Sequence, residues 1–205
     1  MTITAIEPQK KKKERFNIFA DGEYFASLGA EALVKCGLRT GASITRETLN
    51  EAVQQDNARY AFDSAALMLS HSMRTRSEIE TRLKEKGLTE EAVLIALDKL
   101  VSYGYVDDAA YAKEFVQSAL NAQHWGRKVV AYKLKEKGLD RAVIDEAMAL
   151  YTAEDERRIA HRQLQSVLSR PEADARKQRQ KAFAVLSRHG FGYDVISSLL
   201  SEADD

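Results

Sequence analysis

One six-residue segment occurs twice in the chain, letter for letter. Leu83–Leu88 and Leu134–Leu139 both have the sequence Leu-Lys-Glu-Lys-Gly-Leu, and they lie 51 residues apart. A weaker third copy follows after a further 52 residues, where Leu186 and Gly190 align with the leucine and glycine. Self-similarity at a fixed spacing indicates a repeat architecture. Other positions that align at these spacings are Tyr60 with Tyr111, Arg76 with Arg127 and Arg179, Ile79 with Val130, and Ile144 with Ile196.

Each repeat has room for three short helices. A spacing near 51 residues is too long for a two-helix repeat, and the 205 residues contain only two prolines. In the second repeat, Asp107 is a good N-cap for a helix that ends near Asn121. A second helix begins near Gly126 and ends at Gly138, a residue suited to a left-handed C-cap. Asp140 caps the third helix, so we expect a helix-turn-helix-like bundle in each repeat.

The N-terminal segment has a different pattern. Residues 1–14 are polar and basic, with Lys10–Lys13 in a row, and we expect them to be disordered. Two aromatic-rich runs flank Asp21-Gly22, a dipeptide that favours the type I′ turn of a β-hairpin. Thr45 then predicts the N-cap of a helix from Arg46 to Gln55.

These patterns predict a mainly α protein: three tandem three-helix repeats that form an elongated molecule, preceded by a small β-hairpin segment. Units that stack in line would each pack chiefly on their neighbours. The expected boundaries are a disordered basic tail at 1–14, a hairpin and helical segment at 15–55, and repeats at 56–106, 107–153 and 154–205.

Positive charge concentrates on the second helix of each repeat, although the whole chain has 31 cationic and 31 acidic side chains. Between Arg127 and Lys137 there are five cations and one acid. Arg76, Arg127 and Arg179 occupy equivalent places near the helix start, where the helix dipole disfavours a cation. A partner that attracts the charge would explain these arginines, and a solvated helix face is the alternative.

Signals of catalysis or of cofactor binding are missing from the sequence. There is one cysteine, the four histidines are scattered, and no glycine-rich phosphate loop occurs. Asp107-Asp108 fits a helix cap better than an acid-base pair. Trp125 is expected in the core, with a partner contact as the alternative. We therefore expect no catalytic residue, no cofactor and no metal site, and a reducing cytoplasm as the location.

Two motifs resemble those of the RecX family of regulatory proteins. One is Arg74–Leu83, and the other is Gly104–Phe115 followed by Gly126 and the Leu134–Leu139 segment. The resemblance covers about residues 56–201, and the N-terminal hairpin is similar to that of some members. The third repeat departs most from the family pattern, around Pro171.

The resemblance implies three tandem three-helix units and binding to the RecA recombinase filament on DNA. It implies inhibition of ATP hydrolysis, strand exchange and coprotease activity, and some members also bind single- or double-stranded DNA. We expect a monomer, an expectation that does not come from the resemblance. No membrane contact is expected, because no apolar run of 18 or more residues occurs. A helix-turn-helix DNA-binding protein or transcriptional regulator is the runner-up, and an unrelated scaffold is a third hypothesis. The residues expected to contact the filament or DNA are Arg74, Arg76, Arg82, Arg127, Lys128, Lys133, Lys135 and Arg179.

Overall fold

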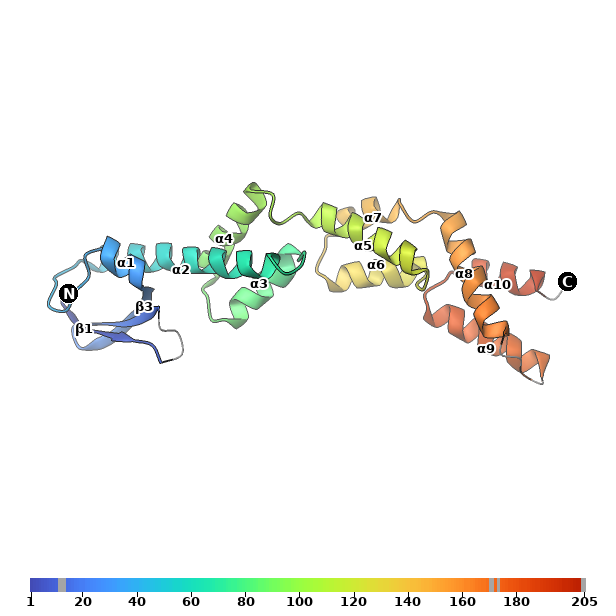
Figure 1. Cartoon of the computed structure of the whole chain (residues 1–205), viewed down its shortest axis with the longest axis horizontal. Helices are drawn as coiled ribbons and strands as arrows, with labels where there is room; N and C mark the ends of the chain where they lie inside the picture. Colours follow the sequence, from blue (N-terminus) through green and yellow to red (C-terminus); the bar gives the residue numbers. More distant parts are fainter. Residues whose placement is uncertain (11–13, 170–171, 173, 204–205) are drawn as a thin grey trace. The chain divides into compact units, whose positions relative to one another are not determined.

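The computed structural model describes the chain except for residues 11–13, 170–171, 173 and 204–205. The described residues form ten helices and three strands, shown in Figure 1. They divide into two compact units. The first comprises Met1–Met73 and Ile79–Val106, and the second comprises Arg74–Glu78 and Asp107–Asp205. No helix in the described part of the chain is long and apolar enough to span a membrane.

The N-terminal module is a three-stranded antiparallel sheet in the order β1-β2-β3. The expected hairpin is confirmed: β2 (Arg15–Ala20) and β3 (Glu23–Gly29) pair across Asp21 and Gly22. Both turn residues have positive φ, 50° and 88°, as a type I′ turn requires.

The expected disorder of residues 1–14 is wrong for the segment that forms β1 (Ile3–Pro8). β1 pairs with β2, and the side chain of Ile3 is fully buried. A short polar segment becomes ordered because a neighbouring strand supplies its backbone hydrogen bonds and a core takes its one buried isoleucine. The structure describes Lys10, but Lys11–Lys13 lie outside the described residues.

One long helix joins the sheet to the first repeat. After α1 (Ala30–Lys35), α2 runs from Arg46 to Leu69, and Thr45 caps it by accepting a hydrogen bond from the Thr48 N–H. We expected this helix to end at Gln55, but it continues across the predicted boundary between residues 55 and 56. No glycine or proline interrupts the helix. It has buried residues both near its start and in its second half. The buried residues of α2 are Leu49, Ala52, Ala61, Ser64 and Ala65.

The first repeat consists of the second half of α2 with α3 (Arg76–Glu85) and α4 (Glu90–Ser102). These helices surround an apolar cluster whose members recur at helical spacing. Tyr60, which the repeat aligns with Tyr111, is half-buried. The buried residues that α3 and α4 contribute to this cluster are Ile79, Leu83, Val93, Ala96, Leu97 and Leu100.

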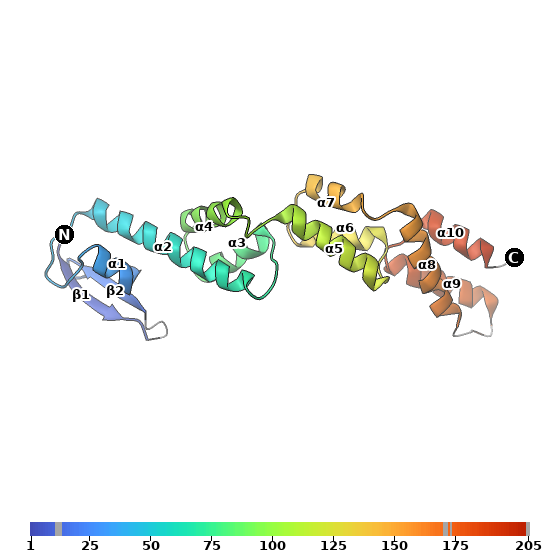
Figure 2. The same ribbon diagram turned by 45° about the horizontal axis from the view of Figure 1, so that its top comes forward.

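The second unit holds six helices, shown from a second angle in Figure 2. The second repeat contains α5 (Asp108–Ala122), α6 (Arg127–Glu136) and α7 (Arg141–Met148), and the third contains α8 (Ala153–Leu168), α9 (Ala175–Arg188) and α10 (Tyr193–Glu202). A single apolar cluster runs through both repeats. The two repeats therefore share one core.

The helix starts in this unit are capped as their residue types suggest, with one exception. Asp107 accepts a hydrogen bond from the Ala110 N–H at 2.8 Å, as predicted. Thr152 and Asp155 form a reciprocal capping box at the start of α8. Asp140 stands at the N-cap position of α7, but its side chain makes no capping hydrogen bond.

Candidate partner-binding surface and repeat joints

The equivalent arginines of α6 and α9 each donate a hydrogen bond to the end of the third helix in their own repeat. The guanidinium of Arg127 donates to the carbonyl oxygen of Tyr151, just after α7. Arg179 Nη1 donates to the carbonyl oxygen of Leu200, in the last turn of α10, at 3.3 Å. The last carbonyl groups of a helix lack hydrogen-bond partners within that helix. Each arginine supplies a donor to a carbonyl group at the end of the third helix of its repeat. A partner and a solvated helix face were the two explanations expected from the sequence, and the structure adds a third for Arg127 and Arg179, a hydrogen bond within their own repeat.

Lys133 and Trp125 also make intramolecular contacts. Lys133 Nζ lies 4.4 Å from the ring centroid of Trp125, a cation–π distance. Trp125 is half-buried against the core of the second unit, and its carbonyl oxygen accepts a 2.8 Å hydrogen bond from the hydroxyl of Tyr151. Burial, together with the nearby carboxylates of Glu156 and Asp155, raises the pKa of Tyr151 far above its ordinary value, so this phenol remains a donor. Trp125 packs on the core as expected.

A basic face remains on α6. Lys128, Tyr132 and Lys135 are exposed at positions i, i+4 and i+7, so they lie along one side of the helix. The ring of Tyr132 is 60% exposed. A hydrogen bond with the carboxylate of Glu136, and the charge of that carboxylate, raise the pKa of Tyr132, which keeps the phenol neutral. Two cations and an aromatic ring on one helix face suit an anionic partner surface or nucleic acid.

The three predicted residues from α3 and the loop before it have different surroundings. Arg74 is half-buried, with Nη1 4.0 Å from Glu78 Oε1. The Arg76 backbone N–H donates to Asp108 Oδ1 at 2.9 Å, and the residue is half-buried. Arg82 is exposed on α3. Of the eight residues predicted to bind a partner, the structure therefore places Lys128 and Lys135 together on an exposed face.

A joint that the sequence analysis missed connects the start of α3 to the end of α6. Thr75 is fully buried, and its hydroxyl donates to the carbonyl oxygen of Lys137 at 2.7 Å. Glu78 Oε1 lies 2.6 Å from Lys137 Nζ. A Cβ atom on Gly138 would overlap the side chain of Ser77. Thr75 and Glu78 also form a capping box, a Thr-x-x-Glu signal that was present in the sequence.

The ion pair in this joint shifts the titration of its acid. Burial raises the pKa of Glu78, but the hydrogen bonds from Lys137 and from the Thr75 N–H, with the charges of Lys137 and Arg74, outweigh it. The net result is a pKa below the ordinary value for a glutamate. The carboxylate is therefore ionised in the joint at neutral pH.

A second joint connects the start of α6 to the end of α9. The N–H groups of Gly126 and Lys128 donate to the carbonyl oxygens of His189 and Gly190, at 2.7 and 3.1 Å. A Cβ atom on Gly126 would lie 2.6 Å from the carbonyl carbon of Gly190. The His124 and His189 rings are 4.4 Å apart, and burial, then His124 and Arg188, lower the pKa of His189. Both joints thus bring the start of one second helix against the end of the next.

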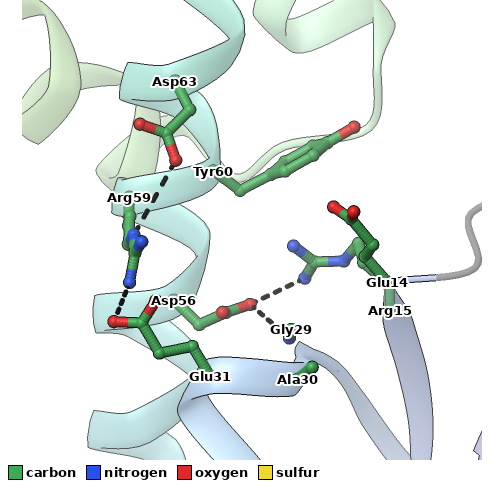
Figure 3. A pocket seen from close by; sticks show the side chains of 9 residues that line it. All are labelled: Glu14, Arg15, Gly29, Ala30, Glu31, Asp56, Arg59, Tyr60 and Asp63. Carbon is green, nitrogen blue, oxygen red and sulfur yellow. Dashed lines mark hydrogen bonds and ion pairs between the residues drawn. The ribbon is translucent and has the colours of Figure 1, made fainter.

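A cavity of about 690 Å³ in the first unit lies between the sheet and α2 (Figure 3). Arg15 is buried beside it and pairs with Asp56 at 3.0 Å, while the Gly29 N–H donates to the same carboxylate at 3.1 Å. Arg15 also donates to Ser27 and lies 4.6 Å from the ring centroid of Tyr60. These groups satisfy one another, so the cluster anchors the sheet to the helix. Across the described residues, no three His, Cys, Asp or Glu side chains are grouped to hold a metal ion.

The repeats, their joints and the N-terminal sheet define a helical-repeat protein built from three-helix units. Family models for RecX match this chain in three places: the N-terminal domain at residues 1–45, the first three-helix domain at 61–100 and the second at 107–148. The chain belongs to the RecX family of regulatory proteins.

Individual relatives support the assignment over almost the full length. Regulatory protein RecX of Clostridium acetobutylicum is 31% identical over 207 residues, covering 98% of this chain and 95% of the relative. The Bacillus licheniformis protein of the same name is 34% identical over 203 residues, covering 98% and 77%. A crystal structure of regulatory protein RecX aligns with a TM-score of 0.70 at 29% identity, covering 100% and 99%. The RecX structure from Lactobacillus salivarius gives 0.68 at 27% identity, covering 73% and 98%.

Proposed function

We propose that this protein is a non-enzymatic regulator that binds the RecA–DNA filament. Binding would inhibit or modulate the ATPase, strand-exchange and coprotease activities in recombination, DNA repair and the SOS response. The observation that carries the proposal is the match to regulatory RecX proteins along 98% of the chain. The protein would act as a cytoplasmic monomer and need no cofactor.

The exposed face of α6 is the proposed contact surface in the second unit. Lys128 and Lys135 would meet acidic side chains of the filament or phosphates of its DNA, and Tyr132 would add apolar contact area. Such a binder shifts the filament toward an inactive state only if it binds that state more tightly than the active one. Arg74, Arg76 and Arg82 would extend the contact from α3 and the loop before it.

Arg127, Lys133 and Arg179 would contribute to binding through the field of their charges. Their side chains already contact Tyr151, Trp125 and Leu200 within their own repeats. An arginine that donates to a carbonyl keeps its full charge, so it still attracts an anionic partner. Replacing one of these residues would therefore alter both folding stability and binding.

A helix-turn-helix DNA-binding protein is the competing function. Its recognition helix would read base edges with side chains such as Asn, Gln or Arg. The exposed face of α6 presents lysines at Lys128 and Lys135 instead, which suit phosphate contacts without sequence preference. This chemistry favours a filament regulator over a sequence-specific repressor.

The test is the ATPase rate of RecA on single-stranded DNA while this protein is titrated in. We expect inhibition at or below one protein per RecA subunit, together with slower strand exchange. Unchanged ATPase, strand exchange and filament length across a wide titration would rule the proposal out. Preferential binding to one duplex sequence at several salt concentrations would favour the transcriptional alternative.

A further inference from the structure

The second helices of the three repeats end in the same backbone turn. Gly87, Gly138 and Gly190 have φ of 80°, 74° and 86°. Just after α3, the N–H of Gly87 donates to the carbonyl oxygen of Lys84 at 2.9 Å, and the N–H of Leu88 donates to that of Leu83 at 3.4 Å. The equivalent distances at the end of α6 are also 2.9 and 3.4 Å. This is the Schellman motif, and the backbone bonds at Gly190 and Phe191, at 3.0 and 3.2 Å, follow the same pattern at the end of α9.

Two of these turns are covered by the start of another helix. The turn at Gly138 receives the segment from Thr75 to Glu78 through the hydroxyl and carboxylate contacts of the first joint. The turn at Gly190 receives the start of α6, and a Cβ on Gly190 would lie 2.6 Å from the Val129 backbone nitrogen. In both cases the glycine is required because the partner helix occupies the space of a side chain.

The turn at Gly87 is uncovered. Apart from its chain neighbours, no heavy atom of the described residues lies within 4 Å of a Cβ position on Gly87. Lys86 is exposed, and no acid in the described ranges lies within ion-pair distance of its ammonium group. A cavity of about 250 Å³ adjoins the turn, bounded on the other side by Tyr24, Asn57 and other residues of the sheet and α2. The space has room for a few side chains.

We infer that the Lys86–Gly87 turn is a docking site for the first turn of a helix of a partner protein. That helix carries a hydroxyl residue at its N-cap, a small residue two positions later and a carboxylate one position after that. The inference comes from the letter-for-letter identity of the two Leu-Lys-Glu-Lys-Gly-Leu segments, one of which binds such a helix start within this chain. The three groups at the end of α6 that contact Thr75, Ser77 and Glu78 each have a counterpart at this turn.

The counterparts can be named one by one. The carbonyl oxygen of Lys86 replaces that of Lys137 as the acceptor for the hydroxyl. The bare Cα of Gly87 replaces that of Gly138 beside the small residue. The ammonium group of Lys86 replaces that of Lys137 as the partner of the carboxylate.

A second copy of this chain does not have the required chemistry at its other helix starts. The segment from Thr75 to Glu78 is already engaged with the end of α6. In α9 the positions equivalent to Ser77 and Glu78 are Gln180 and Lys181, and the helix begins a turn earlier, at Ala175. Lys181 would approach Lys86 with like charge. The partner is therefore another protein.

The experiment uses the full-length, 15N-labelled protein and a capped synthetic peptide with the sequence of Met73–Leu83. An isolated helix this short is marginal in water, so we expect weak binding, with a Kd of about 1 mM. The peptide should shift the backbone amide resonances of Lys86, Gly87 and Leu88. The amides of Lys137–Leu139 should stay in place, because their site is filled. Neither RecA nor DNA is present, so the outcome is independent of the proposed function.

Matched variants separate docking from general effects. A peptide with Glu78→Lys should fail to shift the three amides. Lys86→Glu in the protein should weaken peptide binding about fivefold, the size of one ion pair, whereas Lys35→Glu, at the end of α1, should not. Gly87→Ala should weaken peptide binding at least about tenfold, because the added methyl group fills the docking space. Gly41→Ala imposes the same left-handed strain elsewhere in the chain and should leave peptide binding unchanged.

Three results would overturn the inference. The first is an absence of shifts at Lys86–Leu88 up to several millimolar peptide. The second is equal weakening of binding by the test variants and their controls. The third is a concentration-dependent dimer of the parent protein that Gly87→Ala dissociates, which would make a second copy the occupant.

Discussion

The Arg127 guanidinium, at the first residue of α6, donates a hydrogen bond to the carbonyl oxygen of Tyr151, just beyond α7. Arg179 makes the equivalent bond to Leu200 in the third repeat. These two contacts give the repeated arginines a structural role in addition to the proposed role in partner binding. Because the arginines stabilise their own repeats, a variant that removes one of them tests folding as well as partner binding.

Arg127→Met should lower the free energy of unfolding by about 1 kcal/mol, the usual contribution of one partly exposed hydrogen bond. Lys128→Met, one residue away and exposed, should change it by less than about 0.5 kcal/mol. Urea unfolding of both variants and the parent measures the difference. Equal midpoints for Arg127→Met and the parent would show that the bond to Tyr151 contributes nothing to stability.

Reversing Lys128 and Lys135 to Glu together should weaken inhibition of RecA about tenfold and flatten its salt dependence. Both side chains are exposed, so helicity and melting temperature should stay at the parent values. The double reversal Lys35→Glu with Arg39→Glu, at exposed positions of the first unit, controls for total charge. If the Lys128/Lys135 variant inhibits as well as this control at every salt concentration, the face of α6 does not contact the filament.

Gly138→Val should destabilise the second unit by more than about 1 kcal/mol. A valine at φ of 74° is strained, and its Cβ would overlap Ser77. Gly87→Val has the same strain at φ of 80° but meets no neighbour in the described residues, so it is the matched control. Thermal unfolding should rank the parent above Gly87→Val and Gly87→Val above Gly138→Val. Identical losses would mean that the contact with Ser77 has no energetic consequence.

Acid should weaken the joint between Glu78 and Lys137. The pKa of Glu78 is lowered in the folded protein, so the unfolded state binds the proton more readily. The stabilisation is therefore fully present above the ordinary glutamate pKa, near 4.5, and it is lost as the pH falls through the lower folded value. Glu78→Gln should destabilise the protein at pH 7, and its difference from the parent should shrink as the pH falls below about 4.5. A constant difference from pH 7 to pH 3 would contradict this titration.

Asp56→Ala should destabilise the N-terminal module by about 2–3 kcal/mol. Its side chain is 10% exposed, and its loss would leave the buried guanidinium of Arg15 without its charge partner. Asp63→Ala removes an exposed acid that lies 3.7 Å from Arg59, and it should change stability by less than about 0.5 kcal/mol. Hydrogen exchange of the β2 and β3 amides measures the effect in the sheet itself. Equal protection in the two variants would show that the Arg15–Asp56 pair does not anchor the sheet.

Much of the fold was predictable because its signals are local. Gly138 was expected to adopt a left-handed conformation and does so, with φ of 74°. Asp107 was expected to cap α5, and its side chain accepts the hydrogen bond that defines the cap. Asp21 and Gly22 were expected to form a type I′ turn, and both have positive φ. A cap or a tight turn depends on a few adjacent residues, so their types are enough to indicate it.

The errors at the N-terminus came from contacts that are distant in sequence. No pattern within residues 1–14 indicates that Ile3 pairs with Ala20, so β1 was predicted to be part of a disordered tail. Nothing near Gln55 indicates whether α2 stops or continues, because the answer lies in the burial of Ala61 and Ala65 against the first repeat. Strand pairing and helix length are decided by tertiary packing.

The candidate site was likewise predictable where it depends on local sequence and not where it depends on tertiary contacts. The sequence by itself determined the repeat, the family motifs and the concentration of cations on the second helices, because these depend only on residue types and spacing. Only the tertiary structure decided which cations have a partner within the chain: Arg127, although exposed, donates to Tyr151, half-buried Lys133 lies over the ring of Trp125, and Lys128 and Lys135 are exposed on one face of α6. A side chain's partner is set by the atoms that folding brings near it, and those atoms come from other helices.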